Sequence, residues 1–290
     1  MIKTDVIIIG KGPAGISAAL YTKRANLETI ILGSGVGALE KAHAIENYYG
    51  LESVINGSEL AKRGVAQAEQ LGCIIKDEEV VSITYDSEVY TVKTIDNQYQ
   101  AMAVLLATGA ARTRPPIKNI DVFEGKGVSY CAICDAFFYR QKTVAVIGAK
   151  EYALSEVKEL LPLAKEVLLL TNGEPLTITI PENVKVFNQK ILSIEGDNKV
   201  ESILFDDNTQ IEVAGVFIAV GSAGSSDFAR KLGAFIENGK IVTDQNQNAT
   251  LPGLYAAGDC TVGTQQIAKA VGEGCIAGLS MINYLRVKKK

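Results

Sequence analysis

The chain carries, near its N-terminus, the sequence Asp5-Val6-Ile7-Ile8-Ile9-Gly10-Lys11-Gly12-Pro13-Ala14-Gly15. The apolar run predicts a buried strand, and the glycines after it are typical of the turn that leads into a helix in a dinucleotide-binding unit. The apolar run from Glu28 to Leu32 predicts the second strand of that unit. Residues 5–32 therefore indicate a strand-helix-strand unit that binds a pyrophosphate at the start of its helix.

A second copy of this pattern is incomplete. It reads Thr143-Val144-Ala145-Val146-Ile147-Gly148-Ala149-Lys150-Glu151-Tyr152-Ala153 and keeps the strand and its first glycine. Lys150, however, stands where the backbone of an intact turn approaches the pyrophosphate closely. Similar strand endings at residues 104–109 and 216–221 follow the two copies in the same order. The sequence therefore predicts an internal repeat of a whole nucleotide-binding domain.

The predicted fold class is α/β, with two Rossmann-like nucleotide-binding domains, the second inserted into the first. The segments Arg114-Pro115-Pro116 and Asn238-Gly239-Lys240 are natural crossing points between domains. We therefore expect the second domain at residues 115–242 and a discontinuous first domain at residues 1–114 and 243–290. Helices are expected at residues 13–24, 58–71 and 266–285, with several strands over 74–104 and a short one at 254–257.

The composition restricts the class of protein. The chain has 290 residues, of which 47% are hydrophobic and 21% charged, and its formal net charge is -4. A nucleic-acid-binding protein needs a basic face, so this balance argues against that class. The sequence shows no secretory signal and no apolar run that approaches the ~20 residues of a membrane span. We expect a cytoplasmic protein that binds no membrane.

The cysteines indicate redox chemistry rather than a structural disulfide framework. Their number is odd, and one pair has the spacing Cys131-Ala132-Ile133-Cys134. Such a pair forms a two-electron shuttle, in which one thiol attacks an external disulfide and its partner resolves the mixed intermediate. Asp135 follows the pair and is placed to move a proton. The alternative, half of a zinc site, lacks a second ligand pair, and the sole histidine is in no ligand-spaced cluster, so we expect no metal.

The other cysteines receive different assignments. Cys73 and Cys275 have apolar neighbours and are expected to pack as small hydrophobic residues. Cys260 follows Gly258-Asp259 directly, which predicts a position near the cofactor.

Several motifs together resemble the low-molecular-weight thioredoxin reductases along the whole chain. They are Gly10-x-Gly12-Pro13-Ala14-Gly15, Ile45-Glu46-Asn47-Tyr48-x-Gly50, Ala107-Thr108-Gly109, Gly127-Val128-Ser129-Tyr130-Cys131-x-x-Cys134-Asp135 and Ala256-Ala257-Gly258-Asp259. The resemblance implies FAD in the first domain, a redox disulfide in the second, thioredoxin or a thioredoxin-like protein as partner, and a homodimer. It also implies that Cys134 faces the flavin, that Cys131 attacks thioredoxin, and that Asp135 donates and accepts the proton.

The same resemblance assigns the residues that bind FAD. The pyrophosphate is expected on Gly10, Gly12, Pro13, Ala14 and Gly15, and the flavin side of the cofactor on Asn47, Asp259, Gln266, Ile267 and Ala268. The remaining expected cofactor residues are Ser34, Gly37, Leu39, Val80, Ala107, Thr108, Gly109 and Gly258. Ser34 stands where an acid normally holds a ribose hydroxyl, so that contact is either made by Ser34 or missing.

The departures from the family concern the electron donor. NADPH-dependent members carry an arginine-rich segment that grips the 2′-phosphate, but residues Leu170 to Ile178 contain no arginine or lysine. Thr171 stands where NAD would require an acid. This pattern resembles the ferredoxin-dependent flavin thioredoxin reductases, and we therefore expect reduced ferredoxin as the donor. No cysteine cluster here could hold an iron–sulfur centre, so that cluster must belong to the partner.

Three alternatives stay open at this point. A nicotinamide cofactor could still bind, with Lys150 or Lys165 supplying the compensating charge, in an NAD(P)H-dependent disulfide reductase with an atypical nucleotide site. The enzyme could instead run backwards, as a flavin dithiol oxidase that passes substrate electrons to oxygen. A flavin-binding module without enzymatic activity is the third alternative, and the intact Cys131, Cys134 and Asp135 argue against it.

Overall fold

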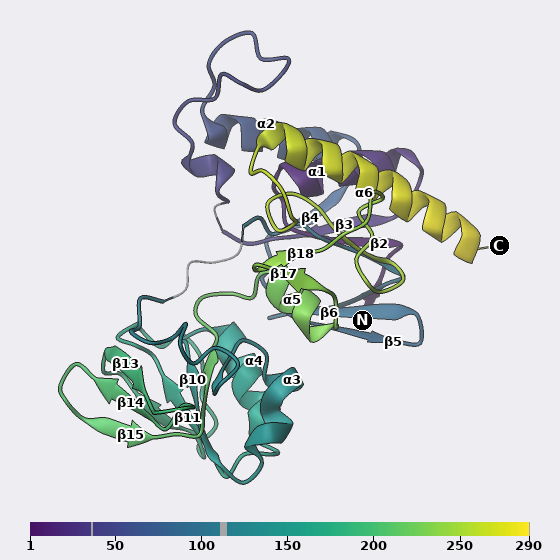
Figure 1. Ribbon diagram of the computed structural model, residues 1–290. Coiled ribbons are helices and arrows are strands. Elements are labelled where there is room, and N and C mark those ends of the chain that lie inside the picture. Colours follow the sequence, from purple (N-terminus) through teal and green to yellow (C-terminus); the bar gives the residue numbers. More distant parts are fainter. Residues whose placement is uncertain (36, 111–114, 290) are drawn as a thin grey trace. The chain divides into compact units, whose positions relative to one another are not determined.

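The computed structural model describes residues 1–35, 37–110 and 115–289. The chain forms two compact units, one made of Met1–Arg112 with Gly224–Lys290 and the other of Thr113–Ala223 (Figure 1). The first expected crossing includes Arg114, which lies outside the described residues. At the other end of the second unit, the chain returns to the first unit at Gly224. The sequence predicted this return at residue 243.

The second crossing differs because the residues expected to link the domains form a hairpin instead. Asn238 and Gly239 both have positive φ, 48° and 74°, and make the turn between strands β17 (Ile236–Glu237) and β18 (Lys240–Ile241). Helix α5 (Ser225–Lys231) precedes this hairpin and is joined to it by the hydrogen bond from Ser226 Oγ to the Gly239 carbonyl, 2.7 Å. The helix and the hairpin therefore fold with the first unit.

A five-stranded parallel sheet is the centre of the first unit. Its order is β19-β8-β2-β3-β4, and the strands are β2 (Val6–Ile9), β3 (Thr29–Leu32), β4 (Ile74–Lys76), β8 (Ala103–Leu106) and β19 (Leu254–Ala256). Every residue of β2, β3, β8 and β19 is buried. These continuous apolar runs are typical of a parallel sheet covered on both faces.

The other elements of the first unit are a small sheet and several helices. The sheet has the order β1-β7-β6-β5, with β1 (Ile2–Lys3), β5 (Val80–Asp86), β6 (Val89–Thr94) and β7 (Gln98–Ala101). The helices are α1 (Pro13–Arg24), η1 (Leu39–Lys41), α2 (Gly57–Gln70) and α6 (Ile267–Lys288). Helix α2 begins after Asn56, whose side chain accepts a hydrogen bond from the Glu59 N–H, a common N-terminal cap.

The second unit repeats the strand-helix-strand pattern. Its parallel sheet has the order β12-β11-β10-β16-β9, with β9 (Val128–Ser129), β10 (Thr143–Ile147), β11 (Glu166–Leu170), β12 (Lys185–Phe187) and β16 (Gly215–Ile218). A three-stranded sheet consists of β13 (Ile191–Glu195), β14 (Ser202–Phe205) and β15 (Gln210–Glu212). The helices are α3 (Ala132–Asp135), η2 (Ala136–Tyr139) and α4 (Glu151–Leu160). The predicted repeat and α/β fold class are confirmed.

Helices α1 and α6 lie side by side in the first unit (Figure 1). Two glycines of α6 allow their backbones to approach. A Cβ added at Gly274 would lie 2.2 Å from the Ala14 carbonyl oxygen, and one added at Gly278 would lie 2.9 Å from the Ala18 carbonyl oxygen. Within the described part of the chain, no helix has both the length and the apolar character that crossing a membrane requires.

Replacing Gly274 by alanine should destabilise the first unit, because overpacking of this kind costs about 1–3 kcal/mol. G272A is the matched control on the same helix, since nothing lies within 4 Å of its added Cβ and alanine is favoured over glycine in a helix by about 1 kcal/mol. Urea denaturation followed by circular dichroism should give a lower midpoint for G274A and an equal or higher one for G272A. Equal midpoints for G274A and the unchanged protein would contradict the close packing of α1 on α6.

Candidate functional site

The first glycine turn connects β2 to α1 at the carboxyl edge of the sheet. A Cβ at Gly10 would lie 2.1 Å from the Ala107 carbonyl oxygen, and one at Gly15 would lie 1.9 Å from the Gly10 carbonyl oxygen. At Gly12, by contrast, nothing lies within 4 Å of an added Cβ. Gly10 and Gly15 are thus required by the fold itself, whereas Gly12 borders open space where a ligand can approach the backbone.

The N-terminus of α1 faces that space with its backbone donors available. Gly12 is the N-cap residue and offers no side-chain cap, while Pro13 takes the first helical turn, where its missing N–H costs nothing. Free N–H groups and the helix dipole both favour a bound anion. Together with the open position at Gly12, this geometry fits a pyrophosphate.

Neighbouring strands bring two more predicted segments to the same edge. The Ala107 N–H donates to the Ile9 carbonyl (2.8 Å), and the Ala257 N–H donates to the Leu106 carbonyl (3.0 Å). A Cβ at Gly258 would lie 3.0 Å from the Ala14 Cβ. The structure therefore brings the turns after β2, β8 and β19 together, as expected for strands that end at one edge of a parallel sheet.

Two further contacts hold these turns, and sequence reasoning did not identify either. The Thr108 N–H and hydroxyl both donate to Ser225 Oγ, at 3.0 and 2.8 Å. Glu273 Oε2 accepts from the Gly258 N–H (2.8 Å) and lies 3.1 Å from Lys269 Nζ. The i,i+4 spacing of Lys269 and Glu273 was a visible signal for their pairing, whereas nothing in the sequence linked Thr108 to Ser225.

The residues expected at the flavin side come from distant parts of the chain. Asn47 Nδ2 donates to Gln266 Oε1 at 3.4 Å, across a separation of 219 residues. Both side chains are exposed, as is Ala268, while Ile267 and Asp259 are half-buried. The structure thus joins Asn47 to the start of α6.

The other predicted cofactor residues are more dispersed. Ser34 is exposed after β3, the Gly37 N–H donates to Glu40 Oε1 at 3.2 Å, and Leu39 begins η1. Gly109 has a φ of +84° with open space around it, and Val80 is buried at the start of β5 in the small sheet.

An ion pair that the sequence did not indicate lies beside the end of β3. Lys11 Nζ is 3.0 Å from Asp77 Oδ1, and a Cβ at Gly33 would lie 3.3 Å from Lys11 Cγ. Lys11 therefore packs at the strand end where the ribose-binding acid of many dinucleotide sites would stand.

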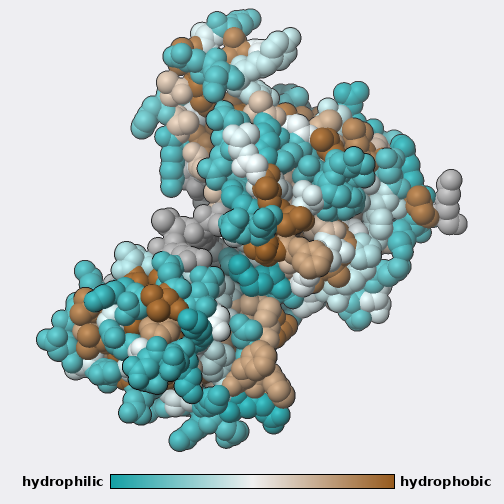
Figure 2. Space-filling model, viewed as in Figure 1, coloured by the Kyte–Doolittle hydropathy of each residue, from teal (hydrophilic) through white to brown (hydrophobic). Residues whose placement is uncertain are grey.

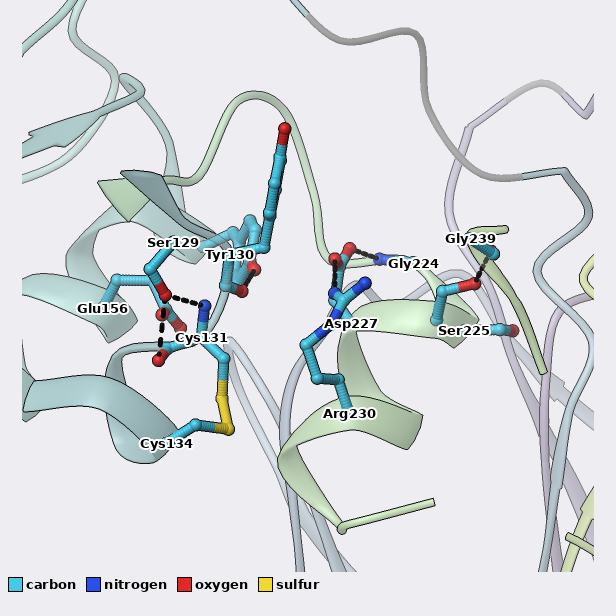
Figure 3. Close-up of polar contacts among 12 residues, drawn as sticks. Ser129, Tyr130, Cys131, Cys134, Glu156, Gly224, Ser225, Asp227, Arg230 and Gly239 are labelled. Carbon is cyan, nitrogen blue, oxygen red and sulfur yellow. Dashed lines mark hydrogen bonds and ion pairs between the residues drawn. A yellow bond between two sulfur atoms is a disulfide. The ribbon is translucent and has the colours of Figure 1, made fainter. Parts of the chain in front are cut away.

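The second unit contains the redox pair (Figure 3). Cys131 and Cys134 form a disulfide, with their Cα atoms 5.4 Å apart. Cys131 is the N-cap residue of α3. Its N–H donates to Ser129 Oγ (3.1 Å), and that hydroxyl donates to Asp135 Oδ2 (2.6 Å). Asp135 is thus held beside the disulfide through Ser129.

The two sulfur-bearing residues differ in exposure. Cys131 is 1% exposed, whereas Cys134 is exposed. Three apolar residues close to Cys134 in the sequence are also exposed. Ile133 is 54% exposed, and Phe137 and Phe138 are each 67% exposed. Figure 2 shows apolar residues at the surface of this unit over the region of α3.

The second glycine turn is closed by the chain itself. A Cβ at Gly148 would lie 2.2 Å from the Ala219 carbonyl oxygen, so this glycine serves the fold as Gly10 does. The Thr177 N–H and hydroxyl both donate to the Ala149 carbonyl, at 3.3 and 3.4 Å. Lys150 is the N-cap residue of α4 and is exposed. The segment after β11 therefore folds back onto the turn where a nucleotide would bind.

The remaining cysteines are not part of the redox pair. Cys73 is buried in the core, where burial raises the pKa of its thiol. Burial also raises the pKa of Cys260 to about 11, and its Sγ lies 3.4 Å from the Leu106 carbonyl oxygen. Cys275 is only half-buried, and its interaction with Tyr21 raises the pKa of that phenol. Among the residues that the structure describes, no group of three or more His, Cys, Asp or Glu could hold a metal ion.

Known proteins are similar to this chain in sequence and in fold. Residues 4–274 match the family described as pyridine nucleotide-disulphide oxidoreductase. The thioredoxin reductase of Aquifex aeolicus is 35% identical over 306 residues, which cover 99% of this chain and 94% of that protein. The structure of the atypical thioredoxin reductase TRi from Desulfovibrio vulgaris Hildenborough is 39% identical with a TM-score of 0.92, covering 98% and 99% of the two chains. A ferredoxin-flavin thioredoxin reductase from Clostridium acetobutylicum is 33% identical with a TM-score of 0.73, covering 99% of each chain.

These matches show that the protein is an oxidoreductase that acts on disulfides. Within that class, the chain belongs to the low-molecular-weight thioredoxin reductases. This membership confirms FAD as the cofactor, and the open turn at Gly12 fits its pyrophosphate.

We predict that Gly12→Val weakens FAD binding at least tenfold without unfolding the apoprotein. An added Cβ at this position has nothing within 4 Å in the protein, but the side chain would enter the space where we expect the pyrophosphate to approach the backbone. Titration of apoprotein with FAD, followed by flavin fluorescence, measures the affinity. In the control G15A, the added Cβ meets the Gly10 carbonyl oxygen, so the apoprotein itself should melt at a lower temperature. Unchanged FAD affinity in G12V would place the pyrophosphate elsewhere.

We predict that Cys260 resists alkylation in the folded protein. With a pKa of about 11, only about one thousandth of this thiol is ionised at pH 8, and the thiolate is the reactive form. Iodoacetamide labelling at pH 8 with peptide mass spectrometry should modify Cys275 before Cys260, and both equally after denaturation. Rapid labelling of native Cys260 would contradict its burial and raised pKa.

Proposed function

We propose that this protein transfers electrons from reduced ferredoxin, through FAD, to the Cys131–Cys134 disulfide and on to thioredoxin or a thioredoxin-like protein. The observation that carries the choice of donor is the second glycine turn. Thr177 donates two hydrogen bonds to Ala149 in that turn, and Lys150 occupies the position of close approach. A pyridine nucleotide would have to displace this segment and accommodate the lysine side chain.

The charge around the turn supports the same conclusion. Residues 170–178 contain no arginine or lysine, so they supply no fork for a 2′-phosphate. Thr171 is buried, and its hydroxyl donates to Asn188 Oδ1 at 3.3 Å. The position of the acid that would bind an NAD ribose is therefore taken by a hydroxyl with an internal partner. The Clostridium acetobutylicum relative, which is named for ferredoxin and flavin, matches 99% of this chain.

The residues near the disulfide can carry out the thiol chemistry. FAD, when bound, supplies the electron pair that reduces the disulfide. Two electrons and two protons convert Cys131–Cys134 to two thiols, and Asp135, held by Ser129, is placed to supply and remove one of those protons. The family resemblance makes Cys131 the attacking thiol, although Cys131 is buried and Cys134 is exposed in the disulfide form. Once Cys131 is accessible to the partner, its thiolate attacks the disulfide of thioredoxin and expels one thiolate. Cys134 then attacks the mixed disulfide, which re-forms Cys131–Cys134 and leaves thioredoxin reduced.

The surface beside Cys134 suits a protein partner. Ile133, Phe137 and Phe138 are exposed, and the Arg140 guanidinium lies 5.6 Å from the centre of the Phe137 ring. Aromatic residues with a neighbouring arginine are enriched at protein interfaces. We propose this surface for thioredoxin, and, from the family resemblance, a homodimer as the assembly, which light scattering can test.

Anaerobic reduction of the FAD-loaded protein tests the proposed donor. Photoreduced ferredoxin should bleach the oxidised flavin band within seconds and should then lead to reduced thioredoxin. The proposed reaction requires a protein that donates electrons to the flavin and requires no pyridine nucleotide. Excess NADPH or NADH should bleach the band at least a hundredfold more slowly. C134S should block thioredoxin reduction, since the second thiol is needed to close the disulfide.

Rapid bleaching by NADPH or NADH would overturn the proposed donor and favour a nicotinamide-dependent reductase with an atypical nucleotide site. Peroxide formation from a dithiol substrate, with no thioredoxin reduction by ferredoxin, would instead favour a dithiol oxidase. Electron transfer that survives in both C131S and C134S would exclude any role for the disulfide.

A further inference from the structure

Two of the segments expected on the flavin side of FAD, Asp259 and residues 266–268, are joined by an exposed loop. Every residue from 262 to 266 is exposed. Gly258 and Gly263 have φ values of +88° and +119°, a region that residues other than glycine rarely adopt. Contacts at the ends of this loop therefore decide where the two segments lie.

Lys269, in the first turn of α6, closes the loop at its base. Its Nζ donates to the Gly258 carbonyl at 3.0 Å and to Thr261 Oγ1 at 2.8 Å, and it lies 3.1 Å from Glu273 Oε2. These three acceptors match the three hydrogens of the ammonium group. A Cβ at Gly263 would lie 3.1 Å from Lys269 Cε, so the stem of the side chain packs against the loop.

Glu273, one turn further along α6, holds the same turn through its other backbone group. Its Oε2 accepts from the Gly258 N–H at 2.8 Å and lies 2.9 Å from Thr261 Oγ1. The side chains of Lys269 and Glu273 are each 15% exposed, so their ion pair is largely shielded from water. The N–H and the carbonyl of Gly258 are thus both bonded to one ion pair, directly before Asp259.

We propose that the Lys269–Glu273 pair is a positioning clamp that holds Asp259 and residues 266–268 at the spacing that FAD requires. The pair lies on the helix that begins beside the second segment, and it bonds the turn that carries the first. Without the clamp, the exposed loop could adopt other conformations, and FAD would have to order it on binding. A preorganised site binds more tightly because this cost is removed.

The proposal rests on the expected contact of Asp259 and residues 266–268 with FAD, which the family resemblance implies. An ion pair that only stabilises the first unit would make the same contacts, so the test must separate FAD binding from folding. D259A reports whether the flavin segment itself is placed correctly.

Lys269→Met removes all three contacts of the ammonium group and keeps an unbranched apolar stem. Because the loss of one partner from a shielded ion pair destabilises a fold, the double variant K269M/E273M, which leaves no unpaired charge, is measured beside it. K288M is the matched control on the same helix. Lys288 is in the last turn of α6 and pairs with Glu88 at 2.6 Å.

The measurement is a titration of each apoprotein with FAD, followed by flavin fluorescence, with the melting temperature of the apoprotein recorded in parallel. We expect K269M and K269M/E273M to bind FAD about tenfold more weakly, since the site is no longer preorganised. K288M should bind FAD as tightly as the unchanged protein. At saturating FAD, the visible circular dichroism of the bound flavin should change in both clamp variants, because the residues around it are displaced.

Unchanged FAD affinity in a folded K269M or K269M/E273M would overturn the proposal and leave the pair as a structural contact. If D259A loses affinity and the two clamp variants do not, the failure is restricted to the clamp. Unchanged affinity in all three would also overturn the expected flavin contact at Asp259. No electron donor takes part in these measurements, so the result does not depend on whether ferredoxin reduces the protein.

Discussion

Close contact between backbones at the carboxyl edge of a parallel sheet is the constraint on which this structure depends. At Gly10 there is no room for a Cβ, because the Ala107 carbonyl oxygen lies 2.1 Å from its ideal position. Gly148 meets the Ala219 carbonyl oxygen in the same way, at 2.2 Å. In both units the first glycine thus lets the strand-helix turn pack against the end of a neighbouring strand. This requirement belongs to the fold and is independent of any bound nucleotide.

The two copies differ at the positions that serve the ligand. Gly12 is bordered by open space, whereas the second copy has Lys150 there and its Ala149 carbonyl accepts hydrogen bonds from Thr177. We propose that the second turn serves as a scaffold for its unit and binds no pyrophosphate. Helix α4, which follows this turn, contacts the segment that carries the disulfide, because Glu156 accepts a hydrogen bond from the Ala132 N–H. The repeated element thus leaves open space at Gly12 in the first unit and contacts the segment with the redox pair in the second.

Much of the fold and part of the site could be predicted because they depend on local sequence patterns. The strand, glycine turn and helix at residues 5–24 each have a local signature, and the spacing of Cys131 and Cys134 suffices for a disulfide. The point where the chain leaves the second unit was harder to predict from the sequence. Asn238 and Gly239 form a turn in either case, and only the contacts of that turn show that it closes a hairpin within the first unit.

The sequence by itself determined the fold class, the intact and degenerate glycine turns and the redox pair, because neighbouring residues specify each of them. Only the tertiary structure decided which side chains support those motifs. Ser225 reaches Thr108 across 117 residues, and Glu156 reaches Ala132 from another helix. Such partners leave no local pattern, since a hydrogen bond requires proximity in space and is indifferent to separation along the chain. The hydrogen bonds that hold the site in place could therefore be identified only from the packed strands and helices.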